Sequence, residues 1–239
     1  MILSGFHAIE EAIRATPKKV EWVLFDTERR DRRSGELKRL CQDAGVAVRH
    51  GPRASLDRLA PRHQGVVARV AEMEFATLDA VFAGPPRSRF IILLDEVQDP
   101  HNVGAVLRVA EGAGARLVVA ERGSAPFSDV VARVSAGAIE RVPVHRAVNL
   151  RRFVDSAREE GFFAVGLDER GKDYYELDLS GDVLLALGSE GKGLRRLVRE
   201  GCDVTARLPM AGALASLNVS TAAAAAAYEV VRQRRKLLA

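Results

Sequence analysis

The stretch Leu184–Arg235, LLALGSEGKGLRRLVREGCDVTARLPMAGALASLNVSTAAAAAAYEVVRQRR, decides the fold of this 239-residue chain. An apolar run at its start, Val183–Leu187, predicts a buried strand, because the run is short and ends at Gly188. A second strand is predicted over Thr205–Pro209. The helix predicted over Val219–Arg235 is rich in alanine and leaves room for another backbone to pack closely. Together these features predict a ligand-binding site at the ends of two strands.

The loops of this stretch carry the polar groups of the predicted site. Gly191 and Gly193 allow a backbone approach that a Cβ would block, and Glu190 has no nearby sequence partner. Ser216 or Asn218 is a natural N-cap for the alanine-rich helix. A strand followed by a Gly-rich loop is common in α/β proteins, so the loop alone leaves a structural role open.

Spacing excludes two familiar nucleotide-binding loops. A P-loop requires Ser or Thr after its lysine, whereas Lys192 is followed by Gly193. The dinucleotide fingerprint G-x-G-x-x-G fails at Gly112 and Gly114, because Leu117 occupies the place of the third glycine.

Composition bounds the class of protein. The chain is 47% apolar and long enough for one large or two modest domains. Of its net charge of +4, the basic excess lies in the first 70 residues, with 14 Lys and Arg against 9 Asp and Glu. This bias favours a polyanionic partner. Two cysteines, Cys41 and Cys202, are too few for a disulfide framework or a metal site, so we expect a reducing cytosol. We expect no signal peptide and no membrane helix, which needs roughly 20 apolar residues.

Residues 1–70 predict a small α/β domain, with strands at Val20–Phe25, Val46–Val48 and Gly65–Val70. The run Arg29–Arg33 can contact phosphates or form a solvated loop, and the sequence leaves both open. Residues 71–88 form a predicted linker, because the sequence GPPRS at its end sustains neither a helix nor a central strand.

Residues 89–239 alternate strands and helices and predict a mostly parallel sheet with helices on both faces. The strand Phe90–Leu94 ends in a polar loop, and a helix is expected from Val103. Asn102 is the N-cap candidate of that helix, and Arg108 lies on it. Open parallel sheets bind ligands at this end of their strands.

Three ordered stretches resemble the motifs of the SpoU/TrmH family of RNA ribose 2′-O-methyltransferases. They are Asn102-x-Gly104-x-x-x-Arg108, Gly188-Ser-Glu190-Gly-x-Gly193, and the run from Pro209 to Ser220, PMAGALASLNVS. The N-terminal Gly5-x-His7-Ala8-x-x-Glu11 and the small domain are similar to members that modify a guanosine of 23S ribosomal RNA. The resemblance covers essentially the whole chain.

The resemblance implies a fold and partners. Residues 89–239 would form a SPOUT methyltransferase domain, a parallel sheet tied in a trefoil knot, against the general rule that connections do not thread. Residues 1–70 would be an RNA substrate-binding domain of the ribosomal-protein L30e-like type. The expected protein is a cytoplasmic homodimer acting on 23S rRNA, naked or in an assembling large ribosomal subunit, with no metal.

The resemblance also implies a site. Gly188, Leu208 and Leu217 would hold S-adenosylmethionine, mainly through backbone groups. Arg108 is the expected catalytic residue. Family proposals make it the general base, but a guanidinium normally stays protonated, so we expect it to pair with the target phosphate and stabilise the alkoxide.

We expect the remaining polar residues of the three motifs to orient groups within the site. Asn102, Ser216 and Asn218 would orient the ribose or the loop backbone, while Glu190 would fix Arg108 or a loop N–H.

The sequence favours methyl transfer from S-adenosylmethionine to the ribose 2′-OH of a guanosine in 23S rRNA. Two alternatives remain open at this point. The first is the same chemistry on transfer RNA, which the N-terminal domain disfavours, because tRNA-acting members often carry short basic helical extensions instead. The second is an RNA-binding protein without catalysis, which the basic N-terminal third would also suit.

Overall fold

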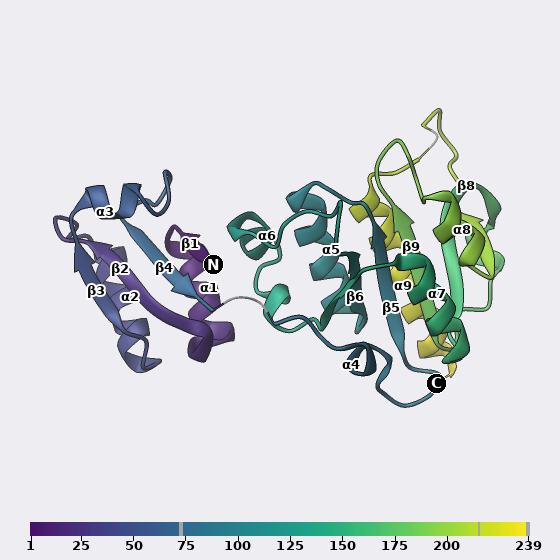
Figure 1. Cartoon of the computed structure of the whole chain (residues 1–239), viewed down its shortest axis with the longest axis horizontal. Coiled ribbons are helices and arrows are strands. Elements are labelled where there is room, and N and C mark those ends of the chain that lie inside the picture. The colour runs from purple at the N-terminus through teal and green to yellow at the C-terminus, as the bar shows by residue number, and fades with distance from the viewer. Residues whose placement is uncertain (72–73, 215, 238–239) are drawn as a thin grey trace. The chain divides into compact units, whose positions relative to one another are not determined.

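The computed structural model describes residues 1–71, 74–214 and 216–237 and divides into two compact units (Figure 1). The first unit contains Met1–Glu74 and Phe127–Arg141, and the second contains Phe75–Pro126 and Val142–Ala239. The segment Phe127–Arg141 therefore groups with the first unit, although it lies between two strands of the second. The predicted division into an RNA-binding domain (1–70), a linker (71–88) and a methyltransferase domain (89–239) stays a proposal.

The first unit is built on a four-stranded sheet in the order β1-β4-β2-β3. Strands β2 and β3 are parallel, whereas β4 is antiparallel to both β1 and β2. The strands are β1 Ile2–Ser4, β2 Val20–Asp26, β3 Val48–Gly51 and β4 Val66–Val70, and the helices are α1 Phe6–Ala15, α2 Arg32–Asp43, α3 Arg53–Asp57 and α6 Asp129–Val134, with 3-10 turns at Pro17–Lys19 and Ala138–Glu140. The sequence analysis did not predict the short strand β1.

The core of the first unit joins the apolar faces of α1 and α2 to the sheet. Phe6, Ile9 and Leu37 from the two helices pack against Val23 and Phe25 of β2. Outside this core, the ammonium of Lys19 lies 3.1 Å from Glu140 and ties the segment that carries α6 to the unit.

The second unit is built on a six-stranded sheet in the order β10-β8-β9-β5-β6-β7, in which every neighbouring pair is parallel. The predicted mostly parallel sheet is thus confirmed. The strands are β5 Phe90–Asp95, β6 Arg116–Ala120, β7 Val144–Ala147, β8 Phe163–Asp173, β9 Val183–Gly188 and β10 Val204–Arg207. The trefoil knot implied by the family resemblance stays a prediction.

Helices cover both faces of this sheet. Helices α4 (Leu78–Phe82), α7 (Leu150–Glu159) and α8 (Arg196–Gly201) share one core with the inward side chains of β5 and β9. Helices α5 (Pro100–Ala113) and α9 (Val219–Leu237) contact each other, and α9 also contacts β9. The predicted alanine-rich helix is present, and its buried alanines Ala223, Ala226 and Ala227 permit this close contact.

The start of α5 differs from the sequence prediction. The helix begins at Pro100, and the side chain of Asp99 caps it by accepting a hydrogen bond from the His101 N–H at 2.9 Å. The prediction that Asn102 is the N-cap is therefore wrong. The Asp-Pro pair is the stronger start signal, because proline at the first helical position fixes φ and needs no donor. Asn102 instead lies inside the first turn and is buried.

Strand β8 continues past the apolar run Phe162–Leu167, which alone predicts a strand, to Asp173. The polar sequence DERGKD gave no strand signal there. Among the described residues, no helix has both the length and the apolar character required to span a membrane.

Gly171 is the sharpest packing constraint between β8 and β10. A Cβ at this position would lie 2.4 Å from the backbone nitrogen of Ala206, which cannot move without shifting β10. We expect Gly171→Ala to lower the free energy of unfolding by about 1–3 kcal/mol in urea denaturation. Gly181→Ala is the matched control, since a Cβ there meets nothing within 4 Å. Equal losses in both variants would contradict the packing described here.

Candidate active site

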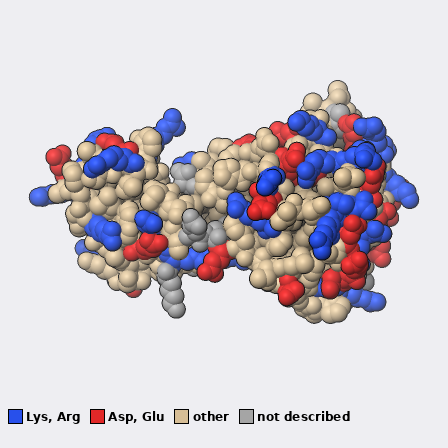
Figure 2. Space-filling view, in the orientation of Figure 1, with Lys and Arg blue, Asp and Glu red and all other residues tan. Residues whose placement is uncertain are grey.

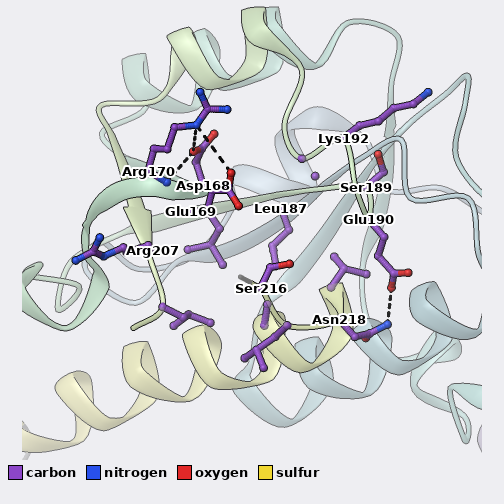
Figure 3. A pocket seen from close by; sticks show the side chains of 18 of the residues that line it. Asp168, Glu169, Arg170, Leu187, Ser189, Glu190, Lys192, Arg207, Ser216 and Asn218 are labelled. Atoms are coloured by element: carbon purple, nitrogen blue, oxygen red, sulfur yellow. Dashed lines mark hydrogen bonds and ion pairs between the residues drawn. The ribbon is translucent and has the colours of Figure 1, made fainter. Parts of the chain in front are cut away.

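A pocket of about 620 Å³ lies at the carboxyl ends of β9 and β10, beside the middle of β8 (Figure 3). Its volume is in the range of small-molecule sites. The lining comes from four segments of the second unit, namely residues 167–170, 187–193, 206–208 with 210, and 216–219, together with Arg199 and Ala222. The predicted cofactor residues Gly188, Leu208 and Leu217 all belong to this lining, as do Glu190, Ser216 and Asn218.

The loop after β9 passes very close to its own strand. A Cβ on Gly188 would lie 1.9 Å from the carbonyl carbon of Gly193, so no side chain fits there. The Gly193 N–H donates to the Ser189 carbonyl at 2.8 Å, which closes the loop on itself. Gly191 and Gly193 have φ of 78° and 65°, a region that favours glycine. One side of the pocket is consequently made of exposed backbone.

A buried carboxylate anchors the far end of this loop. Asp95, at the carboxyl end of β5, is fully buried and accepts hydrogen bonds from the Arg195 backbone N–H at 2.8 Å and from its Nε at 2.7 Å. The Arg195 guanidinium also lies 3.1 Å from Glu96. Sequence reasoning missed this anchor. The signal for it was an acid directly after an apolar strand, which is costly to bury without a cation.

Three predicted site residues meet in one hydrogen-bonded triad, to which each of the three motifs contributes one side chain. The amide nitrogen of Asn102 donates to Glu190 Oε1 at 2.9 Å, and that of Asn218 donates to Asn102 Oδ1 at 3.0 Å. Asn218 also donates to Glu190 Oε1, the bond drawn in Figure 3. Residues separated by 88 and 116 positions along the chain are thereby joined.

Asn218 has a second role at the start of α9. Its Oδ1 accepts a hydrogen bond from the Ser220 N–H at 2.9 Å, which confirms the predicted N-cap. Because the amide nitrogen serves the triad and the amide oxygen serves the helix, the side chain is fixed from both ends. This arrangement orients Glu190 through neutral donors.

Arg108 lies outside the pocket lining. It is on α5 with an exposed side chain, and it forms no hydrogen bond or ion pair within the described ranges. Both hydrogen bonds of the Glu190 carboxylate go to asparagines instead. Six residues after Asn102, Arg108 lies about 9 Å further along the helix. Ser216 lines the pocket but likewise makes no side-chain hydrogen bond to the described chain.

Sequence reasoning missed the part of the lining that comes from β8 and α8. Asp168 Oδ2 lies 3.1 Å from Arg199 Nη1, and Glu169 and Arg170 lie beside them on the pocket wall. Burial raises the pKa of Asp168, but hydrogen bonds from the Arg170 N–H and the Arg199 guanidinium outweigh it and hold the pKa below its usual value. Within the part of the chain that the structure describes, no three His, Cys, Asp or Glu side chains cluster as a metal would require.

Two family profiles match the chain. The profile described as SpoU rRNA Methylase family matches residues 89–228, and that described as RNA 2'-O ribose methyltransferase substrate binding matches residues 2–76.

Full-length relatives and solved structures are also similar. The 23S rRNA (guanosine-2'-O-)-methyltransferase RlmB of Ralstonia nicotianae is 39% identical over 98% of this chain and 96% of its own. The putative TrmH family tRNA/rRNA methyltransferase YacO of Bacillus subtilis is 37% identical over 96% of this chain and 94% of the YacO chain. The crystal structure of the SpoU methyltransferase AviRb from Streptomyces viridochromogenes in complex with the cofactor AdoMet superposes with a TM-score of 0.78 at 31% identity, covering 98% of this chain and 90% of that one.

The triad makes a prediction about coupling between its members. We expect Asn102→Ala and Asn218→Ala each to destabilise the protein, and the double variant to deviate from additivity by about 0.5–3 kcal/mol, because each residue satisfies the other. Urea denaturation of the four proteins measures this coupling.

Asn149 provides the matched control, since its side chain caps α7 by accepting from the Arg152 N–H at 3.0 Å. Asn149→Ala removes the same kind of cap outside the triad and should add to Asn102→Ala within about 0.5 kcal/mol. Additivity in both cycles would contradict a coupled triad.

Proposed function

The chain belongs to the SpoU rRNA methylase family of RNA 2′-O-ribose methyltransferases, and from that membership we propose that it methylates the ribose 2′-OH of a guanosine in 23S rRNA, with S-adenosylmethionine as cofactor. The observation that carries the proposal is the meeting of the three motifs at one pocket, joined by Asn102, Glu190 and Asn218. Glu190 and Asn218 line the pocket, and Asn102 of the first motif is hydrogen-bonded to both.

The volume and the lining of the pocket suit the cofactor. The close approach of Gly188 and Gly193 exposes backbone groups that can bind an adenosine without side-chain interference. Leu208 and Leu217 add apolar surface to the lining. When bound, S-adenosylmethionine supplies a methyl group already activated by the sulfonium. Gly188, Leu208 and Leu217 would hold it, as the resemblance implies.

The chemical task left to the protein is alignment and the handling of one proton. A ribose 2′-OH is a poor nucleophile at neutral pH, so stabilising its developing negative charge lowers the barrier. Arg108 supplies a guanidinium cation for this purpose. In this proposal Arg108 pairs with the target phosphate and stabilises the forming alkoxide. The proton of the 2′-OH passes to the phosphate or to water. The lack of an ion pair to Arg108 within the described residues leaves it available for this role.

The triad residues orient the bound groups in this proposal. Both hydrogen bonds of Glu190 end on Oε1, which leaves Oε2 able to accept a hydrogen bond from a ribose hydroxyl or an ammonium. Ser216 can donate or accept at the same wall. Asn102 and Asn218 hold Glu190 in place and need not touch the substrate themselves.

The N-terminal residues support ribosomal RNA as the substrate. The substrate-binding profile covers residues 2–76, and the relative that acts on 23S rRNA is similar over almost the whole chain. The proposal includes a homodimer in the cytoplasm and the functional division into 1–70, 71–88 and 89–239. On the face of the second unit that Figure 2 shows, cationic and anionic side chains are interspersed, so we expect only a modest salt dependence from that unit.

Arg108 gives the first test of the mechanism. We expect Arg108→Ala to lower kcat for methyl transfer by about 100-fold or more, because it removes the charge that stabilises the alkoxide. Calorimetry should show an S-adenosylmethionine Kd within about twofold of the parent protein's. Arg152→Ala, an exposed arginine of α7, is the control and should leave both values unchanged. Near-normal turnover of Arg108→Ala would remove Arg108 from the mechanism.

A second test addresses the substrate. With cofactor labelled on its methyl group, we expect label to enter guanosine 2′-O positions of 23S rRNA transcripts and not bulk tRNA. Preferential labelling of tRNA would support the alternative substrate. Absence of any S-adenosylmethionine binding in calorimetry would instead leave an RNA-binding protein without catalysis.

A further inference from the structure

Strand β8 leaves its neighbours beside the pocket. Up to Gly166 it pairs with both β9 and β10, through Gly166↔Ala186 and Thr205↔Gly166. Pairing with β10 resumes only at Ala206↔Lys172. Residues 167–171, the β8 bulge, are therefore displaced from the ladder. Bulges that re-aim side chains occur next to active sites.

The β8 bulge is held in place from two sides. Gly171 fits so closely against the backbone of Ala206 that a Cβ would lie 2.4 Å from its nitrogen. Asp168 Oδ1 accepts a hydrogen bond from the Arg170 N–H at 3.0 Å, and its Oδ2 accepts one from Arg199 of α8 at 3.1 Å. Because the side chain of Asp168 is only 12% exposed, this ion pair is shielded from water. The bulge thus has a defined shape.

The next two residues of the bulge keep their charges uncommitted. Arg170 Nε lies 4.0 Å from Glu169 Oε1 and 3.9 Å from Asp168 Oδ1, distances at which exposed ion pairs contribute little. The side chains of Arg170 and Glu169 are 81% and 56% exposed, yet both residues line the pocket. Figure 3 shows the carboxylates of Asp168 and Glu169 close together under the Arg170 guanidinium.

The other carboxylates of the pocket lining already have partners. Asp168 is bound by Arg199, and Glu190 by Asn102 and Asn218. Among the described lining residues, Glu169 is the carboxylate without a hydrogen bond, and its ionic contact with Arg170 is 4.0 Å long. Arg170 is adjacent in sequence and is held only by this contact and the 3.9 Å contact with Asp168.

We propose that Glu169 and Arg170 bind the amino-acid end of the cofactor, with Glu169 facing its ammonium and Arg170 its carboxylate. This inference rests on the proposed function, because it assigns a further role within the same cofactor site. The amino-acid end is a zwitterion, and two neighbouring residues of opposite charge complement it. The leucines and glycines of the lining suit the uncharged adenosine. Asp168 and Arg199 are positioning residues that act through the bulge.

Three ligands separate this role from a general effect on the pocket. S-adenosylmethionine and S-adenosylhomocysteine both carry the amino-acid end, whereas 5′-methylthioadenosine lacks it. We expect Glu169→Gln and Arg170→Gln to raise the calorimetric Kd of the first two by about 3- to 20-fold, and that of methylthioadenosine by less than about twofold. A rise in Kd limited to S-adenosylmethionine, or equal for all three ligands, would overturn the assignment.

The positioning pair requires its own readout. Arg199→Gln should lower the affinity for S-adenosylmethionine. Adding Glu169→Gln to the Arg199→Gln variant should then cause a smaller further loss of affinity than Glu169→Gln causes in the parent protein. Arg199→Lys, which keeps a cation beside Asp168, should restore part of the affinity. Independent effects of Arg199→Gln and Glu169→Gln would overturn the positioning role.

Matched controls lie on the same helix outside the pocket. Arg196 and Glu200 of α8 form an exposed i,i+4 pair at 3.1 Å, and Arg196→Gln or Glu200→Gln should leave all three Kd values unchanged. If the parent protein binds none of the three ligands, the proposed function fails. If it binds all three and the bulge variants bind them equally well, only the present inference fails.

Discussion

The Glu190 carboxylate, held by the amides of Asn102 and Asn218, is the interaction on which the rest of the site depends. It joins the loop after β9, the first turn of α5 and the cap of α9. Asn102 is buried, whereas Glu190 and Asn218 are exposed. The buried amide of Asn102 requires polar partners, and by pairing with both side chains it joins the three segments in one arrangement. The pocket is the space that this arrangement encloses together with the β8 bulge.

Backbone groups and charged side chains have different roles in the site. The absence of side chains at Gly188 and Gly193 brings peptide groups to the pocket surface, where a nucleoside can be bound without strong charges. Structural charges are neutralised in pairs, as for Asp95 with Arg195 and Asp168 with Arg199. Arg108, in contrast, has no ion pair within the described residues. An exposed cation without such a partner is suited to binding an anionic substrate.

The sequence predicted much of this structure where local signals agreed with the fold. The apolar runs of β5 and β9, the alanine-rich α9 and the Asn218 cap all follow local rules. Asn102 was misassigned as a cap because its true role depends on Glu190, 88 residues away. The β8 bulge gave no signal, since LDERG resembles the polar end of any strand. Asp95 with Arg195 was likewise missed, because pairing at long range leaves no periodic pattern.

The most direct measurement of the central claim is a crystal structure of the full chain with S-adenosylmethionine. The account predicts the adenosine between the backbone of Gly188 and the residues Leu208 and Leu217, with the methyl group directed to the side of the pocket that Glu190 lines. A cofactor bound away from the loop after β9, or a protein that takes up none, would contradict it. In that case the convergence of the three motifs would need another explanation.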